Sequence, residues 1–182
     1  RNAYPDEPTL DAGQCVLMPG FVDPHTHLIW AGDRADEFEK KMSGVPYLDI
    51  LAAGGGILST VKATRKASME TLMAETRPRL LRMFRNGTTT AEAKTGYGLQ
   101  ASTELRLLKA LLALNDENPM DLVFTFLGAH AIAPEYKDNP QGYTDEVTNT
   151  MLPMLKEWWQ THAPRYGLPF VDVFCETKAF TL

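Results

Sequence analysis

The chain has 182 residues, of which 44% are hydrophobic and 23% are charged, a composition typical of globular proteins rather than of disordered or fibrous ones. Its 18 Lys and Arg and 23 Asp and Glu give a net charge of −5, so charge offers no reason to bind nucleic acid or anionic lipid. No run of about 18 uncharged apolar residues is present to span a bilayer. We therefore expect one globular domain that binds a small molecule.

The cysteines and the two ends of the chain give further expectations. Cys15 and Cys175 are far apart in a chain without a recognisable signal peptide, which predicts two reduced thiols and a cytoplasmic location. The chain begins at Arg1 rather than at Met, and it ends at Leu182 soon after a strand-like apolar run. We therefore expect a fragment of a longer protein.

The first strand signal lies within residues 16–30, where we expect Phe21 and Val22 to form a short buried core. A loop-rich region follows, and the structural type of residues 57–64 stays open. Ser68 is a good cap for a helix that Pro78 should kink. Asn86-Gly87 should end this helix before a second strand over residues 88–93.

The second half of the chain repeats this alternation. Ser102 should cap a helix that ends at Asn118-Pro119, and the apolar run 122–127 predicts a strand covered on both faces. A loop over residues 134–143 should lead to a helix that begins at Thr144. We expect the apolar face of that helix to consist of Val147, Met151, Leu155 and Trp158. Residues 170–175 should form another buried strand.

This order of strands and helices is typical of α/β proteins with a parallel sheet and right-handed crossovers. A (β/α)₈ barrel, also called a TIM barrel, needs about 250 residues, so four strands amount to about half of one. The pattern alone leaves open an open, doubly wound sheet or the first half of a barrel.

Three of the four histidines lie at the carboxyl ends of predicted strands, where parallel α/β proteins place their chemistry. The sharpest case is His25-Thr26-His27. Residues i and i+2 of a strand point to the same side, so these two imidazoles can bind one divalent ion.

The run Pro19–His27 resembles the first-strand signature of the amidohydrolase superfamily of metal-dependent hydrolases. Three further segments, His27–Arg34, Lys94–Leu99 and Phe126–Tyr136, resemble the imidazolonepropionase family within that superfamily. The resemblance extends over residues 14–176. It favours the barrel, with residues 1–15 as a remnant of an N-terminal β-domain or linker and residues 16–182 as the first half of the catalytic (β/α)₈ barrel. Most of the accessory β-domain would then be missing.

The resemblance implies an activity and a set of site residues. The activity is metal-assisted hydrolysis of the cyclic amide of 4-imidazolone-5-propanoate, which gives N-formimino-L-glutamate in histidine degradation. His25 and His27 would bind one zinc or iron ion. Arg34, Tyr97 and His130 would bind the substrate, and a homodimer of the full-length protein stays open.

Physical chemistry agrees with these roles. The planar guanidinium of Arg34 can bind a carboxylate through two hydrogen bonds, which suits the propanoate group. Glycines on both sides of Tyr97 allow a turn that projects its ring. A neutral His130 can donate or accept a hydrogen bond at the imidazolone. The alternatives are a surface ion pair of Arg34 with Asp33 or Asp36, a packing tyrosine and a structural histidine.

The resemblance is incomplete, because the family takes a third histidine, an Asp and an acidic residue from later strands, and none has a counterpart before Leu182. Two further hypotheses about the protein therefore stay open. The isolated chain could be a non-catalytic half-barrel, or the protein could be another amidohydrolase such as a nucleobase deaminase. We interpret His162 as structural and residues 62–66 as a solvated helix face, and we assign no role to Glu176.

Overall fold

Four strand segments pair into one parallel sheet whose spatial order, β1-β2-β3-β4, equals their order in the sequence. The structure is a computed structural model that describes residues 8, 10–46, 49–50, 53–176 and 179–180. The strands are β1 (Phe21–Thr26), β2 (Thr88–Lys94), β3 (Asp121–Ala129) and β4 (Phe170–Val173). The described helices are α1 (Ala35–Met42), α3 (Ile57–Lys66), α4 (Met69–Arg85), α5 (Ala101–Glu117), α6 (Pro140–Glu146) and α7 (Leu152–His162), with the short turns η1 (Pro134–Tyr136), η2 (Val147–Met151) and η3 (Pro164–Tyr166).

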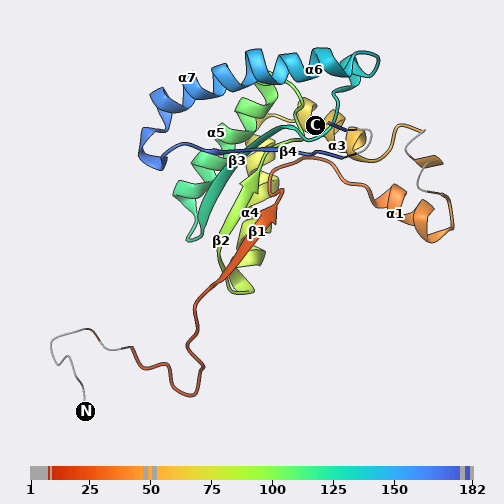
Figure 1. The fold of residues 1–182 in the computed structure, drawn as a ribbon. Coiled ribbons are helices and arrows are strands. Elements are labelled where there is room, and N and C mark those ends of the chain that lie inside the picture. The colour runs from red at the N-terminus through yellow and green to blue at the C-terminus, as the bar shows by residue number, and fades with distance from the viewer. Residues whose placement is uncertain (1–7, 9, 47–48, 51–52, 177–178, 181–182) are drawn as a thin grey trace.

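The strand order decides between the two architectures. A doubly wound sheet reverses its strand order at a switch point, whereas a barrel adds each new strand beside the previous one. The order here is monotonic, and Figure 1 shows α4, α5 and α7 alongside the sheet, while α1 lies away from the strands. The prediction of an α/β fold with the first half of a (β/α)₈ barrel is therefore confirmed.

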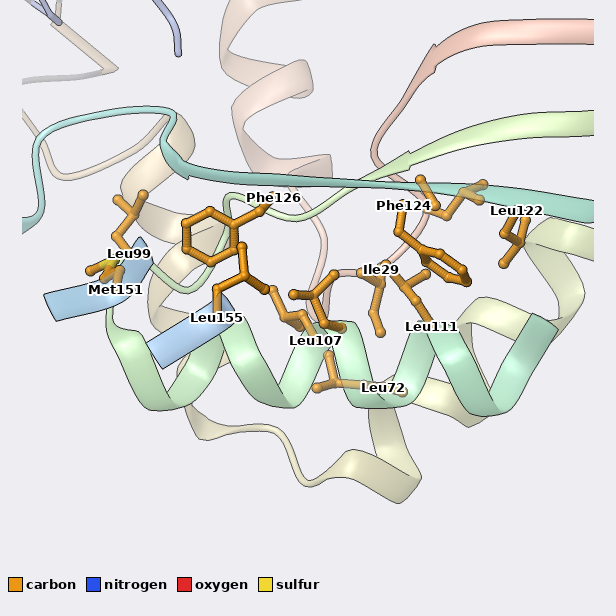
Figure 2. Close-up of a cluster of buried hydrophobic side chains, with 14 of the residues drawn as sticks. Ile29, Leu72, Leu99, Leu107, Leu111, Leu122, Phe124, Phe126, Met151 and Leu155 are labelled. Carbon is orange, nitrogen blue, oxygen red and sulfur yellow. The ribbon is translucent and has the colours of Figure 1, made fainter. Parts of the chain in front are cut away.

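The core lies between the sheet and the helices. Figure 2 shows Phe124 and Phe126 of β3 packed above Leu107 and Leu111 of α5. Ala91 and Ala93 of β2 are fully buried on the same side; the other fully buried members include Ile29, Leu72, Leu108, Tyr143 and Met151. Burying one such large side chain contributes about 1.5–3 kcal/mol, so this layer holds the helices to the strands.

The two outer strands of the sheet have little cover from the described residues. Phe21 and Val22 of β1 are 54% and 65% exposed, and Phe170 and Val171 of β4 are 64% and 56% exposed. The prediction that these two strand segments are buried is therefore wrong. The physical reason is that β1 and β4 are the outer strands of the described sheet, so each has a strand neighbour on one side only.

Two helix starts differ from the expectation. Helix α5 begins at Ala101 with Gln100 at its cap position, so Ser102 lies inside the helix and does not cap it. The region expected to be a loop up to residue 143 contains η1 and the start of α6 at Pro140, where Asn139 caps the helix by accepting from the amide of Gly142. Proline is well tolerated at the first position of a helix, so Pro140 can begin α6 although proline is also typical of loops.

The other helix predictions largely hold. Residues 57–64, whose type was open, belong to α3, and Ser68 caps α4 by accepting from the amide of Thr71 at 3.1 Å. Pro78 lies inside α4, which continues to Arg85. The helical face after residue 144 buries Trp159 rather than Trp158, and the π-helical segment η2 interrupts the regular period just before it.

The segment before β1 lies apart from the sheet. Its described residues are exposed, and Figure 1 shows the chain running away from β1 toward the N-terminus. Cys15 and Cys175 are free and exposed, as expected of two thiols. No helix in the described part of the chain is long and apolar enough to cross a membrane.

Candidate active site

Three histidines converge at the carboxyl ends of β1 and β3. His25 lies in β1, while His27 and His130 directly follow β1 and β3. The ring centroids of His25 and His27 are 5.9 Å apart, and the ring of His27 is stacked on that of His130 with 4.6 Å between centroids. Because the strands are parallel, residues far apart in the sequence meet at one end of the sheet.

Tyr97 completes this ring cluster from the loop after β2. Its ring centroid is 5.0 Å from that of His27 and 5.4 Å from that of His130. Gly96, with a φ of +111°, brings the loop against His130, and a Cβ at this position would come within 2.8 Å of His130 Nδ1. The turn that projects Tyr97 therefore requires glycine.

The imidazole of His130 has a defined hydrogen bond. Its Nδ1 lies 2.9 Å from the carbonyl oxygen of Gly96, which can only accept. Nδ1 therefore carries the proton, and in the neutral ring Nε2 keeps a lone pair. Burial lowers the pKa of His130 below its usual value, which favours this neutral form.

The imidazole of His27 is neutral near pH 7. Burial, with smaller contributions from His130 and His25, lowers its pKa to about 4. Its Nδ1 is buried and has no hydrogen-bond partner. A buried nitrogen without a partner costs about 1–3 kcal/mol, a cost that a ligand bound to this atom would remove.

A charged network lies on the inner face of the sheet. Lys94 of β2 is only 5% exposed, and its Nζ lies 2.5 Å from Asp172 Oδ2 and 3.3 Å from Glu92 Oε1. Thr125 donates to the same Glu92 oxygen at 2.6 Å. Lys94 helps to lower the pKa of His27. The sequence analysis missed this network, although Glu92 and Lys94 are two residues apart on a strand and thus share a face.

Arg34 lies outside the ring cluster, at the start of α1. Its side chain is 41% exposed, and its Nε donates to Glu37 Oε2 at 2.7 Å. Glu37 Oε1 in turn accepts from the amide of Gly56 at 3.0 Å. Neither Asp33 nor Asp36 is the ion-pair partner. The charge of Arg34 is still close enough to lower the pKa of Tyr97, against the larger effect of burial, which raises it.

Several other residues are also assigned by the structure. His162 stacks on Trp158 with 4.9 Å between ring centroids, a contact that supports its interpretation as structural. Arg65, expected on a solvated face, instead donates to the carbonyl oxygen of Gly98. Phe174, just after β4, meets His130 edge-on, a contact that the sequence analysis missed.

The histidine pair fits a divalent ion. Two imidazoles on one zinc place their ring centroids about 5–6 Å apart, which matches the separation of His25 and His27. Metals bind the neutral imidazole, the form that the low pKa of His27 provides. No group of three or more His, Cys, Asp or Glu within the described residues is arranged to hold a metal. If it binds an ion, the pair would account for two of the three protein ligands usual in catalytic zinc sites.

A parallel half-barrel that gathers neutral histidines at its strand ends has the features expected of the amidohydrolase superfamily. No model of a known protein family matches the chain. The chain is 49% identical over 181 residues to an imidazolonepropionase of Herpetosiphon aurantiacus, covering 100% of this chain and 42% of the relative. It is 50% identical over 167 residues to an imidazolonepropionase of Alkaliphilus oremlandii, covering 92% of this chain and 38% of the relative.

An imidazolonepropionase of Chloroflexus aggregans is 47% identical over 182 residues, an alignment that covers 99% of this chain and 43% of that protein. The chain belongs to the imidazolonepropionase family, as the sequence motifs predict. It spans about two fifths of the length of the curated relatives it matches.

Proposed function

We propose that this chain contributes a histidine pair for a metal ion and part of the substrate site to an enzyme that hydrolyses 4-imidazolone-5-propanoate to N-formimino-L-glutamate. The observation that carries the proposal is the convergence of His25, His27, Tyr97 and His130 at one end of the sheet. The names of the relatives support the same reaction.

His25 and His27 would hold one zinc or iron ion, since imidazole suits both metals. The buried, unpartnered Nδ1 of His27 and the low pKa of that ring support this assignment. Such an ion, when bound, acts as a Lewis acid and lowers the pKa of water.

Tyr97 and His130 would bind the imidazolone ring with complementary polarity. Burial raises the pKa of Tyr97, so its hydroxyl stays protonated and can donate to the ring carbonyl oxygen. His130 has its Nδ1 proton directed at the Gly96 carbonyl, so Nε2 accepts from a ring N–H. Of the two roles open to a neutral histidine, donor and acceptor, this assignment leaves His130 the acceptor role toward the substrate.

Arg34 would bind the propanoate carboxylate. A guanidinium offers two parallel donors to a carboxylate, and Arg34 already presents both Nε and an Nη to Glu37. Glu37 therefore occupies the position of a carboxylate partner. Substrate binding would replace this contact or share the guanidinium with it.

Two narrower proposals concern the organisation of the protein. Residues 1–15 would belong to an N-terminal β-domain or linker, and residues 16–182 would form the first half of the catalytic barrel. We also propose that the protein is cytoplasmic. The full-length protein should be tested for a homodimer.

The isolated chain is the second candidate, as a half-barrel without catalysis. The specific observation in its favour is that the described residues contain no cluster of three metal ligands. A nucleobase deaminase is less favoured, because that class does not account for the match of the whole chain to imidazolonepropionases.

The test uses the full-length protein that contains this chain. We expect turnover of 4-imidazolone-5-propanoate, followed by loss of its absorbance, and no turnover of cytosine or guanine. The His25→Ala variant should lose the activity, while the structural His162→Ala variant should retain it. Equal activity on a nucleobase would contradict the proposal.

A further inference from the structure

The carboxylate of Glu104 is fully buried in the first turn of α5, and its partners are three backbone amides and the side chain of Thr95. Its Oε1 accepts from the amides of Gly98 and Leu99, both at 2.7 Å, and its Oε2 accepts from the amide of Gly96 at 2.9 Å. No ion pair to Glu104 occurs among the residues that the structure describes. Its charge is therefore directed at one short loop.

That loop, residues 96–99, carries Tyr97. Its backbone is curled around the carboxylate: Gly96 has a φ of +111° and Leu99 a φ of +52°. A Cβ at Gly98 would come within 2.9 Å of both Glu104 Oε1 and the Glu104 amide nitrogen. The close approach of loop and carboxylate thus depends on the glycine and on a conformation that leucine rarely adopts.

The carbonyl groups of the loop are held from the other side. Arg65 donates to the carbonyl oxygens of Gly98 at 2.6 Å and Leu99 at 3.1 Å. The carbonyl oxygen of Gly96 accepts from His130. Side chains from outside the loop thus pair with the backbone groups on both sides of Tyr97, which restrains the loop.

Two opposing effects act on the pKa of the Glu104 carboxyl group, and burial is the larger one. Burial raises the pKa of Glu104, whereas the hydrogen bonds from Thr95 and from the three loop amides favour its ionised form. The first turn of a 17-residue helix adds the favourable end of the helix dipole. A neutral carboxamide would have only one acceptor oxygen for the same three amides.

We propose that Glu104 is the positioning residue for Tyr97: by accepting from the amides of Gly96, Gly98 and Leu99, it holds the tyrosine ring against His27 and His130 in the geometry that binds substrate. The inference rests on the proposed function, because it assigns Tyr97 to the substrate. Glu104 itself does not touch the ring cluster and acts through the loop.

The first test is kinetic and uses the full-length protein. In Glu104→Gln the side-chain NH₂ group replaces one acceptor oxygen and faces at least one backbone N–H of the loop, where two donors meet. We therefore expect kcat/KM for 4-imidazolone-5-propanoate to fall about 10- to 100-fold. In a Tyr97→Ala background the same substitution should change kcat/KM less than about twofold, because the tyrosine it positions is gone. Fully additive losses would overturn the proposal.

A matched control lies on the same helix. Glu117 is at the opposite end of α5, where it pairs with Arg77 at 2.7 Å. Glu117→Gln makes the same chemical change far from the loop and should leave kcat/KM unchanged. Gly98→Ala disturbs the same contact from the loop side and should reproduce the Glu104→Gln loss, which provides a second variant if the first does not fold.

The second test needs no substrate. Hydrogen exchange of the amides of Gly96, Gly98 and Leu99 should accelerate at least about tenfold in Glu104→Gln and stay unchanged in Glu117→Gln. Unchanged exchange in Glu104→Gln would overturn the claim that this carboxylate holds the loop. If the wild-type protein does not turn over 4-imidazolone-5-propanoate, the proposed function fails, while the exchange measurement still decides the role of Glu104 in the loop.

Discussion

The imidazole rings of His27 and His130 lie stacked across the end of β2, with 4.6 Å between their centroids and 10° between their planes. The low pKa of each ring follows from burial first, and the charge of one would disfavour the charge of the other. Two neutral imidazoles in contact therefore present lone pairs at the strand ends, which is the form that either a metal or a ring N–H requires.

We expect His27→Ala to lose bound metal in the full-length protein, because Nδ1 of this residue is buried and has no partner in the described structure. Metal content per protein, measured after dialysis by mass spectrometry, should fall to below about a tenth of the wild-type value, given that removal of one of few ligands collapses affinity. His162→Ala is the control, since His162 stacks on Trp158 elsewhere. Full metal retention by His27→Ala would argue against the assignment.

Arg34→Ala should mainly raise KM for 4-imidazolone-5-propanoate. Hydrogen bonds to charged groups contribute about 1.5–3 kcal/mol, which corresponds to about a 10- to 150-fold change. Arg34→Lys should recover only part of the loss, because an ammonium cannot form the paired contact. Steady-state kinetics test this prediction. A change confined to kcat would contradict a carboxylate-binding role for Arg34.

Glu37→Gln gives a related but separate prediction. The Glu37 carboxylate binds Arg34 at 2.7 Å, so it competes with the substrate carboxylate for the same donors. We therefore expect Glu37→Gln to lower KM in steady-state assays. A rise in KM would contradict this account of competition.

The isolated 182-residue chain should neither hydrolyse 4-imidazolone-5-propanoate nor retain stoichiometric metal. Its described residues offer two imidazoles as a pair, and no group of three His, Cys, Asp or Glu among them is arranged to hold one metal ion. Dialysis followed by metal analysis, together with an absorbance assay, tests both statements. Turnover by this polypeptide alone would show the prediction to be wrong.

The Lys94–Asp172 pair predicts a pH dependence of stability. The hydrogen bond and charge of Lys94 lower the pKa of Asp172, so the contribution of this carboxylate is present above its unfolded pKa of about 3.9 and is lost as the pH falls through its folded pKa. Wild type should thus be more stable than Asp172→Asn in urea titrations at pH 7. The difference should shrink toward zero as the pH falls below the unfolded pKa and through the lowered folded pKa, and a difference independent of pH would contradict this account.

Much of the fold could be predicted because its signals are local. The β-type runs and the cap at Ser68 mark the strands and α4 directly. The errors arise where tertiary context decides. Exposure of Phe21 depends on what covers the second face of the sheet, which no local pattern records. The start of α6 at Pro140 was obscured because proline and glycine also mark loops.

The ring cluster was predictable because histidines after parallel strands converge by geometry. The residues that support it were not. Glu104 and Arg65 read as ordinary members of amphipathic helices, and only the folded chain brings them to the 96–99 loop. The metal and substrate roles of His25, His27, Arg34, Tyr97 and His130 stay predictions, and the experiments above test them.

The loops after β2 and β3 are tied to one another: His130 bonds the Gly96 carbonyl, and Arg65 bridges Gly98 to Glu135. A change of substrate preference by loop exchange would therefore have to transplant both loops together with the helix that supplies Arg65. Grafting either loop alone would break contacts on which the other loop depends, so the two loops have to be exchanged as one unit.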